Sequence, residues 1–253
     1  MTLGRTILVV LAACLAVSGF AGADTARVHV NEDSDARAIE IAQHSVAVMG
    51  GWEALDQTRF VSWKFFGRRQ HYWDRHTGDI RIESDRDGAR TVILMNIHSK
   101  EGRAFKDGVM LEGAEAQEML ENGHQTWVND SYWMLMPYKL LDPGVTLKYA
   151  GEKSTAEGNE AWVLDLTFND GIGYTPQNRY HVYIGQRSGV VEQWDFFADA
   201  SQEEPNFASP WKDWKAFGGI MLATNHGRDI DWKIAVHETL APGVLTDPTK
   251  IGN

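Results

Sequence analysis

The sequence has a single cysteine in 253 residues, and this residue, Cys14, lies in an apolar run near the N-terminus. Beyond that run the chain has no disulfide bond and no cysteine nucleophile, so its stability must come from packing. Basic residues are also scarce, with 24 Lys and Arg against 35 Asp and Glu, which gives a net charge of −11. This acidic balance disfavours nucleic acid and anionic lipid headgroups as partners.

Sequence motifs of enzymes are missing as well. The chain has no Gly-x-Ser-x-Gly elbow, and Gly171-Ile172-Gly173 lacks the third glycine of a dinucleotide-binding turn. His237-Glu238 begins like a zinc-protease motif, but no second histidine follows four residues after the first. The sequence therefore nominates no nucleophile with its base and predicts no cofactor.

Metal-binding patterns are incomplete. The run from Glu83 to Gly88 resembles the start of a calcium loop, but it begins with Glu in place of Asp and has Leu94 where the twelfth ligand should be Glu. His71 and His76 flank Asp74, yet their spacing places them on opposite faces of an extended strand. We therefore predict no metal site.

The N-terminus has the pattern of a secretory signal peptide. A charged start, MTLGR, is followed by an apolar run from Thr6 to Phe20 and by the small residues Ala21-Gly22-Ala23. The run is too short for a membrane span of roughly 20 residues. Because an apolar stretch continues past Cys14, lipid modification of that cysteine is the weaker alternative. We expect residues 1–23 to be a signal peptide, residues 24–253 to be one domain, and the protein to be periplasmic or exported.

Apolar periodicity predicts one amphipathic helix and then many strands. Ile39, Ala42, Val46 and Met49 recur at helical spacing, with Ser34 as the expected N-cap, Gly50-Gly51 as the stop and a turn at Trp52 to Leu55. The expected strands are residues 59–68, 70–74, 79–84, 91–97, 145–151, 161–168, 179–185, 190–197, 211–217, 220–223 and 229–237. Hairpin turns are expected at Gly78, at Asp87-Gly88 and at Asp107-Gly108. Residues 199–210 and 240–253 are expected to be an acidic loop and an irregular tail.

The segment from Trp127 to Leu141 is the most apolar part of the chain after the N-terminal run. Ten of its fifteen residues are Trp, Tyr, Val, Leu or Met. It follows a polar helical pattern from Ala114 to His124. Residues 129–131 are expected to cap the start of a short apolar helix, and Pro137 is expected to end it. A helix that is apolar on every side has to be enclosed, so we expect a sheet to wrap around it. The predicted fold class is mainly β with α (α+β), with this helix on the concave side of one curved antiparallel sheet.

Aromatic residues are the remaining feature, because the chain contains ten tryptophans. A single tryptophan is usually a core residue, but together they can line an apolar pocket. Sugar-binding platforms use the same residue type. The candidate ligand-binding residues are Trp63, Phe65, Trp73, Trp133, Met136, Trp162, Trp194 and Trp214.

Several motifs resemble a known family. They are Met49-Gly50-Gly51-Trp52-Glu53-Ala54-Leu55, Trp211-Lys212-Asp213-Trp214 followed by residues 217–222, and the central Val128-Asn129-Asp130-Ser131-Tyr132-Trp133. The chain resembles uncharacterised exported bacterial proteins that look like the LolA/LolB group of periplasmic lipoprotein carriers. The resemblance implies a half-barrel, a strongly curved sheet with helices on its concave side, and binding of acyl chains without catalysis. Ala223 departs from the motif, because relatives often have proline there.

Three functions remain open at this point. The first is a non-enzymatic envelope protein whose partner is an apolar small molecule, a lipid or a lipoprotein acyl chain, with transient contacts to the membrane or to envelope proteins. The second is an enzyme whose site joins distant residues such as Asp130, His181 and Asp195. The third is a carbohydrate-binding or scaffolding β module. A structure with converging polar groups would favour the enzyme. An exposed row of tryptophans would favour the sugar-binding module, and an enclosed apolar cavity would favour the lipid-binding protein.

Overall fold

The computed structural model describes residues 27–86, 88–228 and 230–250. They form mainly antiparallel sheets with a few helices, which confirms the predicted α+β class. No helix in these ranges is both long and apolar enough to cross a membrane. The expected signal peptide and its cleavage site lie outside the described residues.

The strands form three hydrogen-bonded ladders. The first has the order β14-β1-β2-β3-β4-β5-β6, with bounds Ala235–His237, Phe60–Phe65, Arg69–Asp74, Asp79–Arg86, Ala89–Asn96, Gly102–Lys106 and Val109–Met110. The second has the order β11-β10-β9-β8-β7, with bounds Phe207–Pro210, Val191–Phe197, Arg179–Gly185, Glu160–Phe168 and Val145–Ser154. The third is the hairpin of β12, Lys212–Phe217, and β13, Ile220–Asn225. The pairs Arg86↔Ala89 and Lys106↔Val109 confirm two of the expected hairpins.

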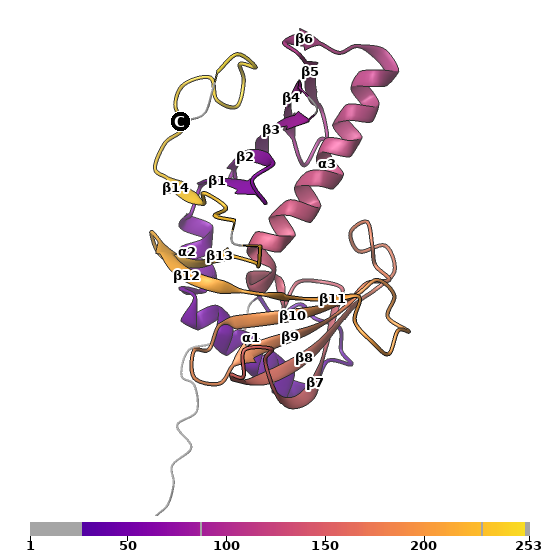
Figure 1. The fold of residues 1–253 in the computed structure, drawn as a ribbon, viewed down its shortest axis with the longest axis vertical. Helices are drawn as coiled ribbons and strands as arrows, with labels where there is room; N and C mark the ends of the chain where they lie inside the picture. The colour runs from indigo at the N-terminus through magenta and orange to yellow at the C-terminus, as the bar shows by residue number, and fades with distance from the viewer. Residues whose placement is uncertain (1–26, 87, 229, 251–253) are drawn as a thin grey trace, which may run out of the picture.

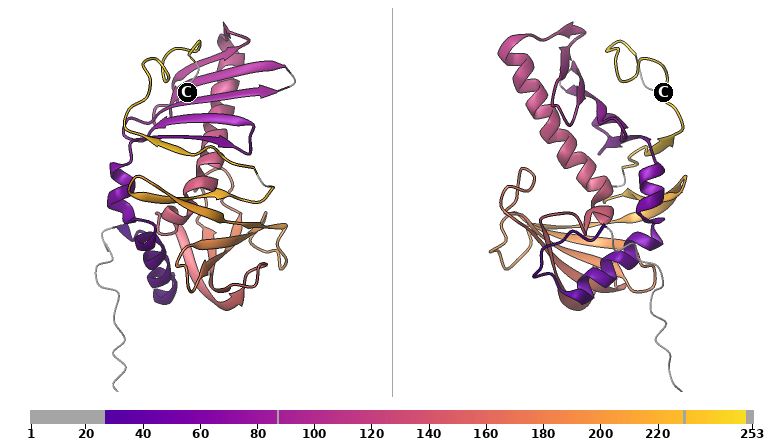
Figure 2. Two further views of the ribbon diagram at one scale, coloured as in Figure 1. Left: turned by 60° about the vertical axis from the view of Figure 1, so that its left-hand side comes forward. Right: turned by 180° about the vertical axis from the view of Figure 1, so that it is seen from behind.

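The three ladders follow one another along the long axis of the molecule, with the β12-β13 hairpin between the two larger ones (Figure 2). The long helix α3, Gly113–Leu135, runs diagonally past one side of the seven-stranded ladder and ends above the five-stranded ladder (Figure 1). The inner face of each ladder is the one that packs against α3 and its continuation. Helices therefore lie on one side of a layer of strands, as the half-barrel arrangement requires.

Two short helices begin the described chain. Helix α1, Ala36–Val48, buries the apolar stripe that the sequence predicts, and Gly50 ends it in the left-handed region at φ 108°. The expected cap is wrong: Asp35 occupies the N-cap position, and the Ser34 hydroxyl accepts a hydrogen bond from the Leu147 amide at 3.1 Å. The expected turn after Gly50 is also wrong, because α2, Gly51–Gln57, is a helix.

The central segment differs most from its prediction. Helix α3 is continuous through residues 129–131, where an N-cap was expected, and a 3-10 turn, Met136–Lys139, follows it. Asp130 caps nothing there; its side chain is fully buried and points to strand β2. Helix α3 ends before Pro137, as predicted. Enclosure on every side is also wrong for part of the segment, because Trp127 and Trp133 are only half-buried.

The end of the chain departs from its prediction in two places. Residues 230–234 are not a strand, because Lys233 has a left-handed φ of 51°, although Trp232 and Ile234 are buried. Strand β11 lies within the expected acidic loop. Residues 240–250 are irregular, as predicted, but they are held against the outer face of the seven-stranded ladder by the fully buried Arg81.

Candidate functional site

A cavity of about 760 Å³ lies between the second half of α3 and the inner face of the five-stranded ladder. Its walls are mainly aromatic. The apolar and aromatic residues that line it are Val128, Tyr132, Trp133, Pro143, Val145, Phe168, Ile172, Tyr174, Tyr180, Trp194, Phe196, Ala198 and Phe207. A volume of this size is within the range of small-molecule and cofactor sites, roughly 300 to 1,000 Å³.

Strand alternation and register place these rings on one face. Tyr180 of β9 pairs with Phe196 of β10, which pairs with Phe207 of β11, so three aromatic side chains stand side by side across three strands. Trp194, two residues before Phe196, faces the same way, and its ring lies 4.9 Å from that of Tyr180. The inner face of this ladder is therefore an aromatic surface rather than an aliphatic one.

The end of α3 supplies the opposite wall. Tyr132 and Trp133 project from its last turns, and the Trp133 ring meets Trp194 edge-on at 4.5 Å between centroids. Burial raises the pKa of the Tyr132 hydroxyl well above its usual value and raises that of Tyr180 as well. Both phenols, one on α3 and one on β9, are therefore neutral at physiological pH.

The mouth of the cavity is apolar as well. Ile172, Tyr174 and Phe207 line it and have exposed fractions of 37%, 42% and 42%. They are three of the six large hydrophobic residues that are exposed among the described residues. An exposed apolar rim around an apolar cavity is typical of a binding site rather than of a sealed core.

Ionisable groups other than tyrosine are few around the cavity. Lys139 and Asp142 line it, and they form an ion pair with each other. The remaining polar lining residues are amides and one hydroxyl: Gln125, Asn129, Thr175, Gln177 and Asn178. No pair of a nucleophile and a base converges on the space among the residues that line it.

The residues of the enzyme alternative lie in two different places. Asp130 sits between α3 and the inner face of the seven-stranded ladder, where it accepts hydrogen bonds from Arg69 at 2.7 Å and from His71 at 2.8 Å. His181 and Asp195 pair across β9 and β10 on the outer face of the five-stranded ladder. The ladder itself separates them from Asp130, so these three residues do not form one site.

Asp130 and His71 form a buried polar cluster with Arg69. Burial acts to raise the pKa of Asp130, but the hydrogen bonds and charges of His71 and Arg69 hold it below its usual value. Burial lowers the pKa of His71. The cluster joins α3 to β2, so both residues have a structural role. From the sequence, Asp130 was a candidate N-cap residue and His71 belonged to an incomplete metal-binding pattern. No group of three or more metal-ligating side chains occurs in the described part of the chain.

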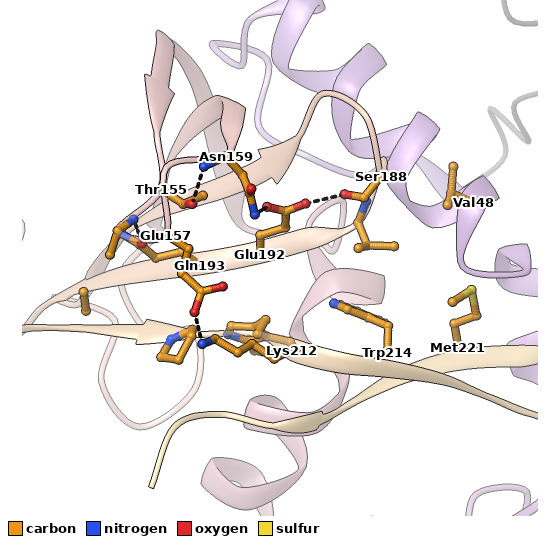
Figure 3. Close-up of a pocket in the computed structure, with 15 residues that line it drawn as sticks. Val48, Thr155, Glu157, Asn159, Ser188, Glu192, Gln193, Lys212, Trp214 and Met221 are labelled. Atoms are coloured by element: carbon orange, nitrogen blue, oxygen red, sulfur yellow. Dashed lines mark hydrogen bonds and ion pairs between the residues drawn. The ribbon is translucent and has the colours of Figure 1, made fainter. Parts of the chain in front are cut away.

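A second hollow of about 490 Å³ lies between β10, the β7-β8 turn and β12 (Figure 3). Its polar side chains are already paired with each other: Lys212 with Glu157, and Glu192 with both Asn159 and Ser188. Trp214 is partly buried in its wall and donates to the Val191 carbonyl at 2.9 Å. Because the charged side chains in its lining pair with neighbouring side chains of the same hollow, we regard the larger aromatic cavity as the candidate site.

The structure brings only some of the predicted ligand-binding residues together. Trp133 and Trp194 line the cavity, and Phe65 lines an adjoining pocket together with Trp133. Trp63 and Met136 are core residues with exposed fractions of 0% and 1%.

The other three predicted residues lie elsewhere. Trp73 packs edge-on against Trp127 of α3, and Trp162 lies beside His44 of α1. Trp214 lines the second hollow. Sequence reasoning missed Tyr132, Phe168, Tyr180, Phe196 and Phe207. The alternation through Leu164, Leu166 and Phe168 was a signal that could have included Phe168.

Comparison with known proteins yields likeness of fold only. The sequence matches no family model and no curated protein. Among solved structures, a DUF1329 family protein from Desulfovibrio piger has a TM-score of 0.43 and 12% identity, over 83% of this chain and 97% of that one. A putative outer membrane lipoprotein-sorting protein domain from Vibrio parahaemolyticus has a TM-score of 0.41 and 11% identity, over 83% and 96%. A LolA superfamily protein from Nitrosomonas europaea has a TM-score of 0.36 and 12% identity, over 80% and 94%. The expected resemblance to LolA-superfamily proteins is thus also found among solved structures.

Proposed function

We propose that this protein is a non-enzymatic, exported envelope protein that binds an acyl chain or another apolar ligand in the aromatic cavity. The observation that carries the proposal is the 760 Å³ cavity with three exposed apolar residues at its mouth. A space lined in this way either stays dry or takes up something apolar. Export is supported by the signal-peptide pattern of residues 1–23.

Burial of apolar area supplies the binding free energy in this proposal. Each methylene group that leaves water contributes about 0.8 kcal/mol. Two further carbons should therefore strengthen binding about 15-fold until the chain fills the cavity. Because this term is not electrostatic, affinity for an uncharged or zwitterionic amphiphile should depend little on salt.

The test is a titration of the delipidated protein with lysophosphatidylcholines of increasing acyl length. Trp133 and Trp194 line the cavity, so tryptophan fluorescence reports directly on occupancy. We expect saturable binding that strengthens with each added pair of carbons and then reaches a plateau. Absence of a saturable change at every chain length would overturn the proposal.

Two matched variants locate the binding site. Ala198 is exposed and lines the aromatic cavity, whereas Ala156 is exposed and lines the second hollow. Ala198→Trp should obstruct the cavity and weaken binding at least tenfold, while Ala156→Trp should leave affinity unchanged. The reverse pattern would assign the ligand to the second hollow.

The sugar-binding alternative finds less support. All ten tryptophans lie within the described residues, and each of them is buried or half-buried. A flat exposed row of tryptophans, which would stack on sugar rings, is therefore not present there. Binding of soluble oligosaccharides in the same fluorescence assay, without binding of acyl ligands, would nevertheless favour that alternative.

A further inference from the structure

A third pocket, of about 510 Å³, adjoins the aromatic cavity. The two share Asn129, Trp133 and Phe207 as lining residues. The rings of Trp133 and Phe207 are nearly parallel, with an interplanar angle of 11° and 6.2 Å between centroids. These stacked rings thus form a common edge, and a molecule lying across it would occupy both spaces.

The lining of this third pocket is cationic. Arg68, Arg69 and Arg228 line it, and no carboxylate does among the described residues. Three arginines at one place contrast with the net charge of −11 of the whole chain. Although the acidic balance disfavours anions at the surface in general, the charged side chains that line this pocket are all positive.

Aromatic rings hold two of the guanidinium groups. Arg69 lies over the ring of Phe65 at 4.9 Å, and Arg228 lies over the ring of Phe66 at 5.2 Å. Such contacts orient a guanidinium group while leaving its N–H edge available. Phe66 and Arg228 both have left-handed φ angles, 43° and 66°, so the two turns carry backbone strain at the pocket.

Donor groups remain available to a ligand. The Nε and Nη2 atoms of Arg69 bind Asp130, which leaves Nη1 as its remaining donor group. Arg68 and Arg228 are exposed side chains from two different turns. The Asp130 carboxylate does not compete, because it is fully buried and already accepts from both Arg69 and His71.

We propose that the ligand is an anionic amphiphile whose acyl chain lies in the aromatic cavity and whose phosphate or carboxylate head binds Arg68, Arg69 and Arg228. This rests on the proposed function and adds the chemistry of the head to it. Arginine forks match the geometry of phosphate and carboxylate oxygens, and the partly enclosed pocket strengthens the charge interaction.

The test compares two monoacyl lipids with the same chain. Lysophosphatidylglycerol carries a net negative head, and lysophosphatidylcholine is zwitterionic. We expect the wild-type protein to bind the anionic lipid at least tenfold more tightly at low salt, and high salt should reduce this preference. Equal affinity for the two lipids would overturn this inference and leave the acyl-binding proposal intact, whereas failure of both lipids to bind would overturn both.

Variants assign the preference to the arginines. The double variant Arg68→Gln, Arg228→Gln should lose the preference and keep its affinity for lysophosphatidylcholine. It leaves Arg69 in place, because that side chain also holds Asp130. The control is Arg187→Gln, at the exposed β9-β10 turn. A preference that persists in the double variant would contradict the assignment.

Inorganic phosphate alone separates a lipid head from a free anion. We expect it to bind far more weakly than the anionic lipid, because it lacks the buried chain. A different result would be tight, saturable binding of phosphate that the double variant loses, with no preference for the anionic lipid. It would show that the pocket binds free anions, and it would overturn the proposal of an anionic amphiphile.

Discussion

Asp130 of α3 and His71 of β2 are joined by a 2.8 Å hydrogen bond, although the exposed fractions of their side chains are only 0% and 1%. Arg69, which is 31% exposed, bonds the same carboxylate and connects the pair to the solvent. A buried carboxylate is costly unless it is paired and hydrogen-bonded. This pairing therefore fixes α3, and with it one wall of the aromatic cavity, to the seven-stranded ladder.

Asp130→Asn should destabilise the protein by about 3 kcal/mol, because it removes one member of a buried ionic cluster. The control is Asp165→Asn, which breaks a pair with Arg179 whose two side chains are 24% and 23% exposed. That change should cost about 1 kcal/mol or less. Urea unfolding of both variants measures the difference, and equal costs would show that the Asp130 cluster does not stabilise the fold.

Acidification should destabilise the protein through His226. Burial lowers the pKa of this histidine to about 3, and its ring is stacked on Trp232 at 4.2 Å. Between the ordinary histidine value and this one, the unfolded chain binds a proton that the folded chain does not. The contribution of His226 to the free energy of unfolding is therefore largely present above about pH 6.5 and falls as the pH decreases. At pH 5 it is lower by about 2 kcal/mol.

His226→Gln should flatten that dependence, because glutamine does not titrate. Urea unfolding at about pH 7 and pH 5 compares the variant with the wild type and with His98→Gln, a change at an exposed side chain. The lowered pKa of His71 acts in the same direction, so some dependence should remain. If His226→Gln retains the full wild-type loss of stability, the assignment to His226 is wrong.

Gly50→Ala should be far more destabilising than Gly158→Ala. Both glycines have left-handed φ angles, 108° and 86°, so each substitution carries about 1 to 2 kcal/mol of backbone strain. A Cβ at Gly50 would also lie 2.1 Å from the Gly219 carbonyl oxygen, whereas one at Gly158 has nothing within 4 Å. We expect at least about 2 kcal/mol of further loss at Gly50 from this overlap. Chemical unfolding of the two variants measures it, and equal losses would contradict the close approach.

Arg81→Met should release the C-terminal tail from the seven-stranded ladder. The guanidinium group of Arg81 donates to the carbonyls of residues 244, 247, 248 and 250, and hydrogen bonds from a charged donor contribute about 1.5 to 3 kcal/mol each. Limited proteolysis should then cleave residues 241–250 while the remaining chain stays resistant. The control is Arg103→Met, which removes one bond to the Thr246 carbonyl and should leave the tail protected. A protected tail in Arg81→Met would show that other contacts hold it.

The cavity shows which part of the site local sequence could not supply. Its walls include residues of α3, β7, β8, β9, β10 and β11, and Tyr180 and Phe207 flank Phe196 only because two strand registers align them. A tryptophan such as Trp63 has the same residue type as Trp194, yet it is a core residue stacked on His71 at 4.3 Å. Residue type predicts that an aromatic ring is buried, but only its neighbours decide whether a cavity lies beside it.

The sequence by itself determined most of the strands and turns and the α+β class, because alternation and glycine turns act over a few residues. It did not indicate the short strands β5, β6 and β11. It could not determine that α3 runs unbroken through residues 129–131. The same residue types serve as an N-cap or as a buried ion partner, and the partners of Asp130 are 59 and 61 residues away. Only the tertiary structure could decide between the two, because the free energy that favours the continuous helix comes from contacts that form when α3 meets the sheet.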